Sequence, residues 1–140
     1  MKITGWFDGA YDSESQIASY GALLKIAGET IWEEHGQAGK GLEMTCNVAE
    51  YCGLIALLEE IKRRDLKVVT VHGDSRMVIR QMAGSYKAKR GAYIPYFHRS
   101  RELAASMTTA LNYQWLPRER NMEADNLSKG LVSNADSKFA

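Results

Sequence analysis

The sequence predicts an α/β fold in which a mixed β-sheet carries helices on its faces. Three strand-like stretches follow one another near the N-terminus, and strand-like and helix-like patterns then alternate toward residue 129. The first arrangement is typical of an antiparallel meander, whereas the second favours right-handed crossovers between neighbouring strands. With 140 residues, of which 45% are hydrophobic, the chain is long enough for one domain with one core.

The N-terminal meander is predicted from alternating side chains interrupted by turn residues. A glycine stops the first strand, so Asp8 is expected at the end of that strand, and the Ala27-Gly28 pair is expected to form the turn between the next two. The strands are expected over residues 2–9, 19–26 and 29–35. A glycine-rich loop is predicted over residues 36–44.

A helix is predicted from Asn47 onward, because apolar residues recur there at helical spacing and Glu60 and Arg64 form a charge pair four residues apart. The β-branched run 68–72 is typical of a strand that is buried on both faces, and it ends at Gly73-Asp74-Ser75, where a second helix begins. The remaining elements are expected to be a helix over 95–110, a strand over 112–116 and a helix over 123–129.

Composition excludes several classes of protein. No apolar run approaches the ~20 residues of a membrane helix, and no signal-peptide pattern opens the chain, so we expect a cytoplasmic protein without a membrane partner. Two cysteines, Cys46 and Cys52, are too few for a disulfide framework, and no Cys/His pairs have zinc-ligand spacing. Net charge is only +1, so a polyanion would have to bind at a local basic patch.

Acidic residues at the ends of predicted elements indicate a possible metal site. Right-handed crossovers would place Asp8 beside Asp74, and Glu50 is expected in the first turn of the helix between them, with Asp125 at the start of the last helix. Converging carboxylates repel one another unless a cation compensates, and all-oxygen ligands suit Mg²⁺. Each acid also has a simpler interpretation, as a turn residue or as a helix cap.

Five short motifs, taken in order, resemble those of the type 1 ribonuclease H family, in its compact archaeal-like and bacterial branch. Any one of them would be weak, but their order along nearly the whole chain makes the resemblance specific. The motifs are Phe7-Asp8-Gly9-Ala10, Tyr20-Gly21-Ala22, the segment from Thr45 to Tyr51, the segment from His72 to Gln81, and the segment from Pro117 to Leu127.

This resemblance implies the fold, the reaction and the site. The implied fold is a ribonuclease H-like, five-stranded mixed sheet flanked by helices, formed by a catalytic domain over residues 1–130 and followed by a polar, frayed tail over 131–140. The implied reaction is two-metal-ion hydrolysis of the RNA strand of RNA/DNA hybrids, which leaves 3′-hydroxyl and 5′-phosphate ends. Two Mg²⁺ ions, with Mn²⁺ as a substitute, are implied on the four acids Asp8, Glu50, Asp74 and Asp125.

Substrate contacts are implied at Gly9, Asn47 and Ser75. At the position where many members carry a histidine, this chain has Arg118, which is expected either to contact a phosphate or to be an ordinary surface arginine. Cys46 replaces the first Asn of the usual Thr-Asn-Asn and is not interpreted as a nucleophile. The basic protrusion of the longer enzymes is absent, so residues 86–90, with Arg76 and Arg80, are left to hold the duplex.

Two alternative functions share the predicted fold. One is a non-catalytic RNA- or hybrid-binding module, and the other is a DNA resolvase or transposase core, which would share the acids without the segment from Thr45 to Tyr51. We expect a monomer without an obligatory protein partner. His72 is interpreted as a core histidine, and Trp6, Trp32 and Trp115 are interpreted as packing on strands and not as base-stacking residues.

Overall fold

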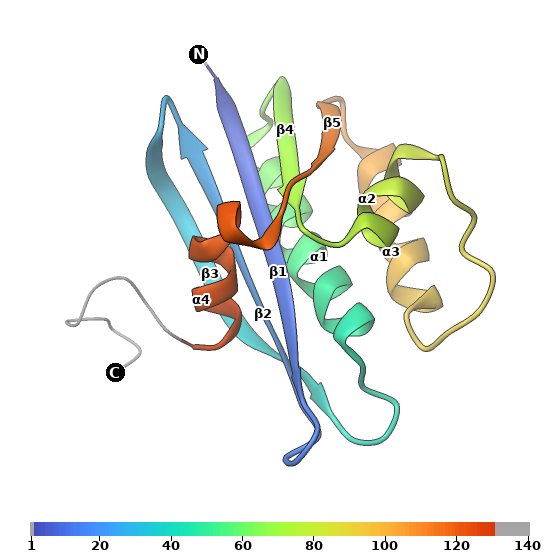
Figure 1. The fold of residues 1–140 in the computed structure, drawn as a ribbon. Helices are drawn as coiled ribbons and strands as arrows, with labels where there is room; N and C mark the ends of the chain where they lie inside the picture. The colour runs from blue at the N-terminus through green and yellow to red at the C-terminus, as the bar shows by residue number, and fades with distance from the viewer. Residues whose placement is uncertain (1, 131–140) are drawn as a thin grey trace.

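The computed structural model describes residues 2–130 and shows a single five-stranded sheet with helices on both faces (Figure 1). The strands are β1 (Ile3–Asp12), β2 (Ile17–Ile26), β3 (Glu29–Lys40), β4 (Val68–Gly73) and β5 (Ala110–Trp115). The helices are α1 (Cys46–Arg64), α2 (Arg76–Ala83), α3 (Ile94–Ser106), the 3₁₀ turn η1 (Arg118–Arg120) and α4 (Met122–Ser128).

The sheet is mixed, as the sequence predicted. Its strand order is β3-β2-β1-β4-β5, in which β1 pairs antiparallel with β2 and β2 with β3, whereas β4 is parallel to both β1 and β5. The N-terminal meander therefore forms one half of the sheet, and the crossovers through helices form the other half. β1 and β4 are neighbours, as expected, and this pairing places the chain after β4 beside the middle of β1.

Helices α1 and α4 cover opposite faces of the sheet, and glycines allow both to approach closely. A Cβ atom at Gly5 would meet Leu57 of α1, whereas one at Gly21, which pairs with Asp8 of β1, would meet Leu127 and the backbone of α4. Because side chains alternate between faces along a strand, Gly5 and Asp8 belong to different faces of β1. Asp8 thus lies on the α4 face, which Figure 1 shows in front of the sheet.

Most of the core lies between the sheet and α1, α2 and α3. Phe7 of β1, Val71 of β4 and Leu57 of α1 are fully buried there, together with many other aliphatic side chains. A smaller cluster on the opposite face joins Leu23 of β2 to Ala124 and Leu127 of α4, with Trp6 packed against it. This second cluster fixes α4, the helix that carries Asp125.

Several predicted boundaries were wrong. β1 continues through Gly9 to Asp12, β3 continues to Lys40 through most of the predicted loop, and the third long helix ends at Ser106, because Ala110 already begins β5. In each case pairing with a neighbouring strand extends or starts a strand where the local sequence contains turn residues or resembles a helix. The predicted tail, residues 131–140, lies outside the described residues. None of the described helices is long and apolar enough to cross a membrane.

Candidate active site

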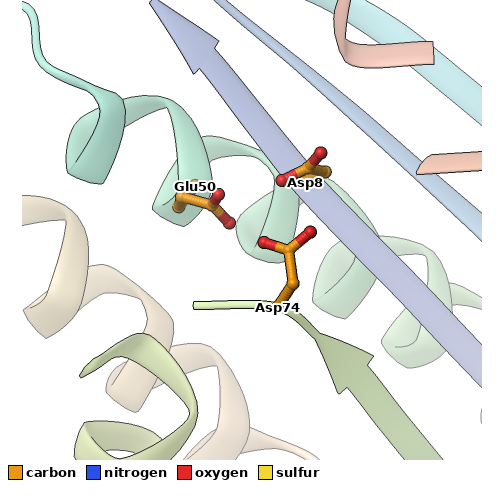
Figure 2. A group of neighbouring side chains, drawn as sticks. All are labelled: Asp8, Glu50 and Asp74. Carbon is orange, nitrogen blue, oxygen red and sulfur yellow. The ribbon is translucent and has the colours of Figure 1, made fainter. Parts of the chain in front are cut away.

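The four predicted acids come from four separate parts of the chain and meet near the middle of the sheet. Asp8 lies in β1 and Glu50 in α1, while Asp74 follows β4 directly and Asp125 lies in α4. One oxygen of each of Asp8, Glu50 and Asp74 can be chosen so that the three lie within 4.8 Å of one another. Figure 2 shows these three carboxylates pointing toward a common centre.

Two details of the predicted positions were wrong. Asp8 is the sixth of ten residues in β1 and not a strand-end residue, and Glu50 is the fifth residue of α1, beyond the first turn. In the folded chain α1 packs closely on β1 at Gly9. A Cβ atom added to Gly9 would stand 2.2 Å from the backbone nitrogen of Glu50. Gly9 is thus required for helix contact, not for a turn, and this contact brings Glu50 to Asp8.

Burial and mutual repulsion govern the electrostatics of the cluster. Burial raises the pKa of Asp8 to about 7; a hydrogen bond with Glu50 opposes this increase, while the charge of Asp74 adds to it. Burial, followed by the charge of Asp8, raises the pKa of Glu50 well above its ordinary value. Burial also raises the pKa of Asp74. Three carboxyl groups are therefore held where their charged forms are costly in the absence of a cation.

The fourth acid, Asp125, differs because two cations contact it. Lys129 Nζ lies 3.2 Å from Asp125 Oδ2, and Arg118 Nη2 lies 3.4 Å from Oδ1. Burial alone would raise the pKa of Asp125, but hydrogen bonds with Asp8 and Lys129 and the charges of both cations outweigh it, so the pKa is lowered. Asp125 therefore remains charged while the other three acids resist ionisation.

Asp74 is positioned by two residues, Asn121 and Trp115, whose role the sequence did not reveal. The buried side chain of Asn121 donates from Nδ2 to the carbonyl of Phe7 at 2.9 Å and to Asp74 Oδ2 at 3.3 Å, and so joins β1 to the end of β4. Trp115 Nε1 donates to the carbonyl of Asp74 at 2.9 Å. Asn121 lies four residues before Asp125, within the last motif of the resemblance. Its position in that motif was the one feature of the sequence that could have indicated a role in the site.

Of the four predicted substrate-binding residues, Gly9 and Arg118 line the pocket that holds the acids, whereas Asn47 and Ser75 do not. That pocket has a volume of about 300 Å³. Ser75 caps α2, since its hydroxyl accepts from Val78 N, and Asn47 lies half-buried in the first turn of α1 without lining that pocket. Cys46 also lines the pocket, and burial raises the pKa of its thiol.

The interpretations of His72, Trp6 and Trp32 as packing residues were confirmed, whereas Trp115 lies on a strand, as expected, without being buried. His72 is buried and stacks on Trp6, with ring centroids 4.2 Å apart, and Trp32 packs against the main core. Trp115, in contrast, is 40% exposed, and the guanidinium of Arg76 lies over its ring at 4.2 Å. An exposed indole beside Asp74 is accessible to a ligand, which a core tryptophan would not be.

The carboxylate cluster fits a divalent cation. Its ligand atoms are oxygens, as hard cations prefer, and Glu50 Oε2 is buried without a hydrogen-bond partner among the described residues. Hydrogen bonds from Asn121 and Trp115 already hold Asp74 in place. The cluster therefore offers an oriented ligand beside negative charge that no cation compensates. A bound cation would satisfy the unpaired oxygen and lower the raised pKa values together.

Comparisons of the sequence and of the structure with known proteins lead to the same kind of domain. The model of the reverse transcriptase-like family matches residues 6–130. The bifunctional protein Rv2228c of Mycobacterium tuberculosis is 35% identical over 137 residues, which are 96% of this chain and 36% of that protein. The structure of its N-terminal RNase H domain, solved as a maltose-binding protein fusion, superimposes with a TM-score of 0.82 at 32% identity and covers 92% of this chain and 91% of that one.

Two further structures are similar. LC11-RNase H1, isolated from compost and solved in complex with an RNA/DNA hybrid, has a TM-score of 0.82 at 30% identity, with 97% of this chain and 100% of that chain covered. RNase H1 of the archaeon Halobacterium salinarum has a TM-score of 0.80 at 28% identity, with 92% and 96% covered. The chain spans about a third of the length of the mycobacterial relatives that it matches in sequence.

Proposed function

The chain belongs to the reverse transcriptase-like family and is a ribonuclease H-type domain; from that premise we propose that it hydrolyses the RNA strand of RNA/DNA hybrids. The observation that carries this proposal is the convergence of Asp8, Glu50 and Asp74 within 4.8 Å at the wall of an open pocket. The hybrid bound in the LC11-RNase H1 structure supports the choice of substrate. Hydrolysis leaves a 3′-hydroxyl and a 5′-phosphate.

In this proposal Asp8, Glu50, Asp74 and Asp125 hold two Mg²⁺ ions, for which Mn²⁺ can substitute. When bound, such a pair of ions activates the attacking water and stabilises the leaving oxygen of the phosphodiester. Asn121 and Trp115 keep Asp74 in place, and Lys129 keeps Asp125 charged. Arg118, 65% exposed and only 3.4 Å from Asp125, offers its free guanidinium nitrogens to a substrate phosphate.

Duplex binding is proposed to depend on an acid-free stretch, residues 75–101. This stretch contains seven Lys and Arg residues and no Asp or Glu, although the whole chain has a net charge of only +1. Its connection between α2 and α3, which we call the basic segment (residues 84–91), borders a hollow of about 590 Å³ with Lys87, Lys89 and Arg90. Clustered cations of this kind bind phosphates regardless of base sequence.

Selection of RNA at the cut strand is proposed to depend on the 2′-hydroxyl, the one local group that distinguishes RNA from DNA. Gly9, Asn47 and Ser75 are the proposed contacts. A cytoplasmic location and a monomeric state remain predictions of the sequence.

The test is cleavage of end-labelled duplexes with and without Mg²⁺. We expect the parent chain to cut RNA/DNA hybrid only with Mg²⁺ and to leave duplex DNA intact, because catalysis requires the metal and recognition of the cut strand requires the 2′-hydroxyl. Extension of the RNA product by a polymerase would identify its 3′-hydroxyl. The Asp74→Asn variant should lose cleavage by about 1,000-fold while still binding the hybrid.

A matched control makes the same chemical change away from the site. Asp65 is an exposed residue with φ 52° at the C-cap of α1, a position at which Asn is tolerated, so Asp65→Asn should cleave like the parent. A parent chain that binds the hybrid and leaves it intact would instead indicate the non-catalytic binding module. Cleavage of duplex DNA would indicate the resolvase or transposase alternative.

A further inference from the structure

The basic segment has no regular secondary structure, although the proposed function requires its cations at a defined place. It begins at Gly84, the C-cap of α2, and leads to Tyr93, just before α3. Lys87, Lys89 and Arg90 are all exposed, and Ala88 is the member of the segment that packs against the core. The position of these cations is therefore set mainly at the two ends of the segment.

One buried amide connects the chain on the two sides of the segment, while the carbonyl of Arg80 holds the first residues of the segment through the backbone of Ser85 and Tyr86. Gln81, 2% exposed, lies in the last turn of α2, three residues before Gly84. Its side-chain Nε2 donates to the hydroxyl of Tyr93 at 3.1 Å, and its backbone carbonyl accepts from Arg101 of α3 at 3.5 Å. The side-chain amide of Gln81 thus joins the helix before the basic segment to Tyr93, two residues beyond its end.

The same amide also reaches the helix that carries Glu50. Gln81 Oε1 accepts a hydrogen bond of 2.5 Å from the hydroxyl of Tyr51, the residue after Glu50 in α1. The rings of Tyr51 and Tyr93 are stacked, with centroids 5.8 Å apart, and Tyr51 is fully buried. Because α1 is rigid, Glu50 on one side of it and Tyr51 on another have a fixed spacing.

We propose that Gln81 is a positioning residue for nucleic-acid binding, which holds the basic segment at a fixed place relative to the carboxylate cluster. The inference rests on the proposed function and adds the residue that connects its two halves. Gln81 touches neither substrate nor metal in this proposal. Its amide is suited to the role because it accepts from one tyrosine and donates to the other.

The test compares Gln81→Met with the parent in two assays. Hybrid binding is measured by fluorescence anisotropy in chelator over a range of salt concentrations, and cleavage kinetics are measured with Mg²⁺. We expect the slope of log affinity against log salt to fall by about 2, because three cations no longer meet the phosphates together. KM should rise about 5- to 10-fold, with kcat within about 2-fold of the parent.

Two further variants separate positioning from general stability. Val69→Ala removes buried volume from β4, outside the basic segment, and should lower stability while leaving the salt slope unchanged. The triple variant Tyr51→Phe, Gln81→Met, Tyr93→Phe removes all three polar groups, so no buried hydroxyl is left unpaired. We expect it to regain stability but to keep the raised KM and the reduced salt slope.

The outcomes distinguish this inference from the proposed function. A salt slope of Gln81→Met equal to that of the parent, or a triple variant that regains the parent KM together with its stability, would overturn the positioning role alone. A parent chain that binds hybrid but does not cut it would overturn the nuclease proposal and leave the slope comparison valid. A parent that binds no hybrid would overturn both.

Discussion

The carboxylate cluster and the acid-free stretch are adjacent regions constructed in opposite ways. The cluster concentrates buried acids where backbone packs against backbone, at Gly9 and Glu50. The acid-free stretch contains seven of the 18 Lys and Arg residues, and Lys87, Lys89 and Arg90 in it are exposed. The remainder of the chain carries 11 cations against 17 acids. The first region therefore fixes buried reactive groups by direct backbone packing, whereas the second presents exposed cations on a segment that is held through the side chain of Gln81.

Glycine substitutions give the largest expected difference between the two regions. Gly9→Ala should lower the free energy of unfolding by about 3 kcal/mol, because the new Cβ would meet backbone atoms of α1 that cannot move aside. Gly84→Ala, in the basic segment, should cost about 1 kcal/mol, since only its φ of +87° is unfavourable and no atom lies within 4 Å. Urea unfolding measures the free energy of unfolding of both variants. An equal decrease in the two variants would contradict the proposed difference in packing.

The pH dependence of stability should come from the cluster. Because the pKa of Asp8 is about 7 in the folded protein and 3.8 unfolded, the folded state binds more protons between these values, and metal-free protein should lose stability as pH rises from 4 to 7. The loss should be roughly 2 kcal/mol, about half of what the full shift would give, because the coupled acids share it.

Denaturant melts in chelator at several pH values measure this loss. Asp8→Asn should flatten the profile, and Mg²⁺ should restore stability at pH 7 in the parent. Asp12→Asn is the matched control, because the pKa of exposed Asp12 is lowered by its hydrogen bonds with Ser15 and Glu14, the opposite direction. A profile that falls equally in Asp8→Asn would show that Asp8 is not its source.

Removal of charge from the basic segment should affect binding alone. The triple variant Lys87→Ala, Lys89→Ala, Arg90→Ala should raise KM about 10-fold and reduce the salt slope by 2 to 3, with kcat unchanged, because these cations contact phosphates away from the reacting bond. The control triple Lys2→Ala, Lys62→Ala, Lys67→Ala makes the same change in net charge on exposed residues outside the acid-free stretch. Equal effects of both triples would mean that net charge, not its location, controls binding.

The smallest expected effect lies where the two regions meet. Trp115→Phe removes the hydrogen bond to the carbonyl of Asp74 but keeps an aromatic face for Arg76. We expect kcat to fall about 3-fold, since water can replace the bond at this exposed position. Steady-state kinetics measure the change. A decrease in hybrid affinity without a change in kcat would place Trp115 with the acid-free stretch instead of the cluster.

The sequence predicted the members of the site better than their surroundings. The sheet type and the pairing of β1 with β4 followed from periodicity, whereas the four acids, which the structure brings to one pocket, came from the resemblance to the ribonuclease H family. The role of Gly9 could not be predicted from the neighbouring sequence, because a glycine that forms a turn and a glycine that packs beneath a helix have the same local sequence pattern. Only the packing of α1 distinguishes them.

Contacts between distant residues explain the other errors. Asn121 bonds to Phe7, 114 positions away, and no local pattern marks that pairing. β3 runs to Lys40 because β2 offers it partners, although its own Gly36 and Gly39 favour a loop. The cation–π contact of Trp115 likewise depends on Arg76, which approaches from a different element.

The position of Asp125 also determines when activity can first arise during synthesis. A growing chain acquires Asp8, Glu50 and Asp74 well before it reaches α4, and α4 docks on β1 and β2 through Leu23, Ala124 and Leu127. Until that helix has been made and has packed, the set of acids is incomplete and the long loop to Asp125 is unclosed. On the proposed function, a chain that has not yet reached α4 would therefore be unable to cut, and cleavage would begin only once α4 had packed against the sheet.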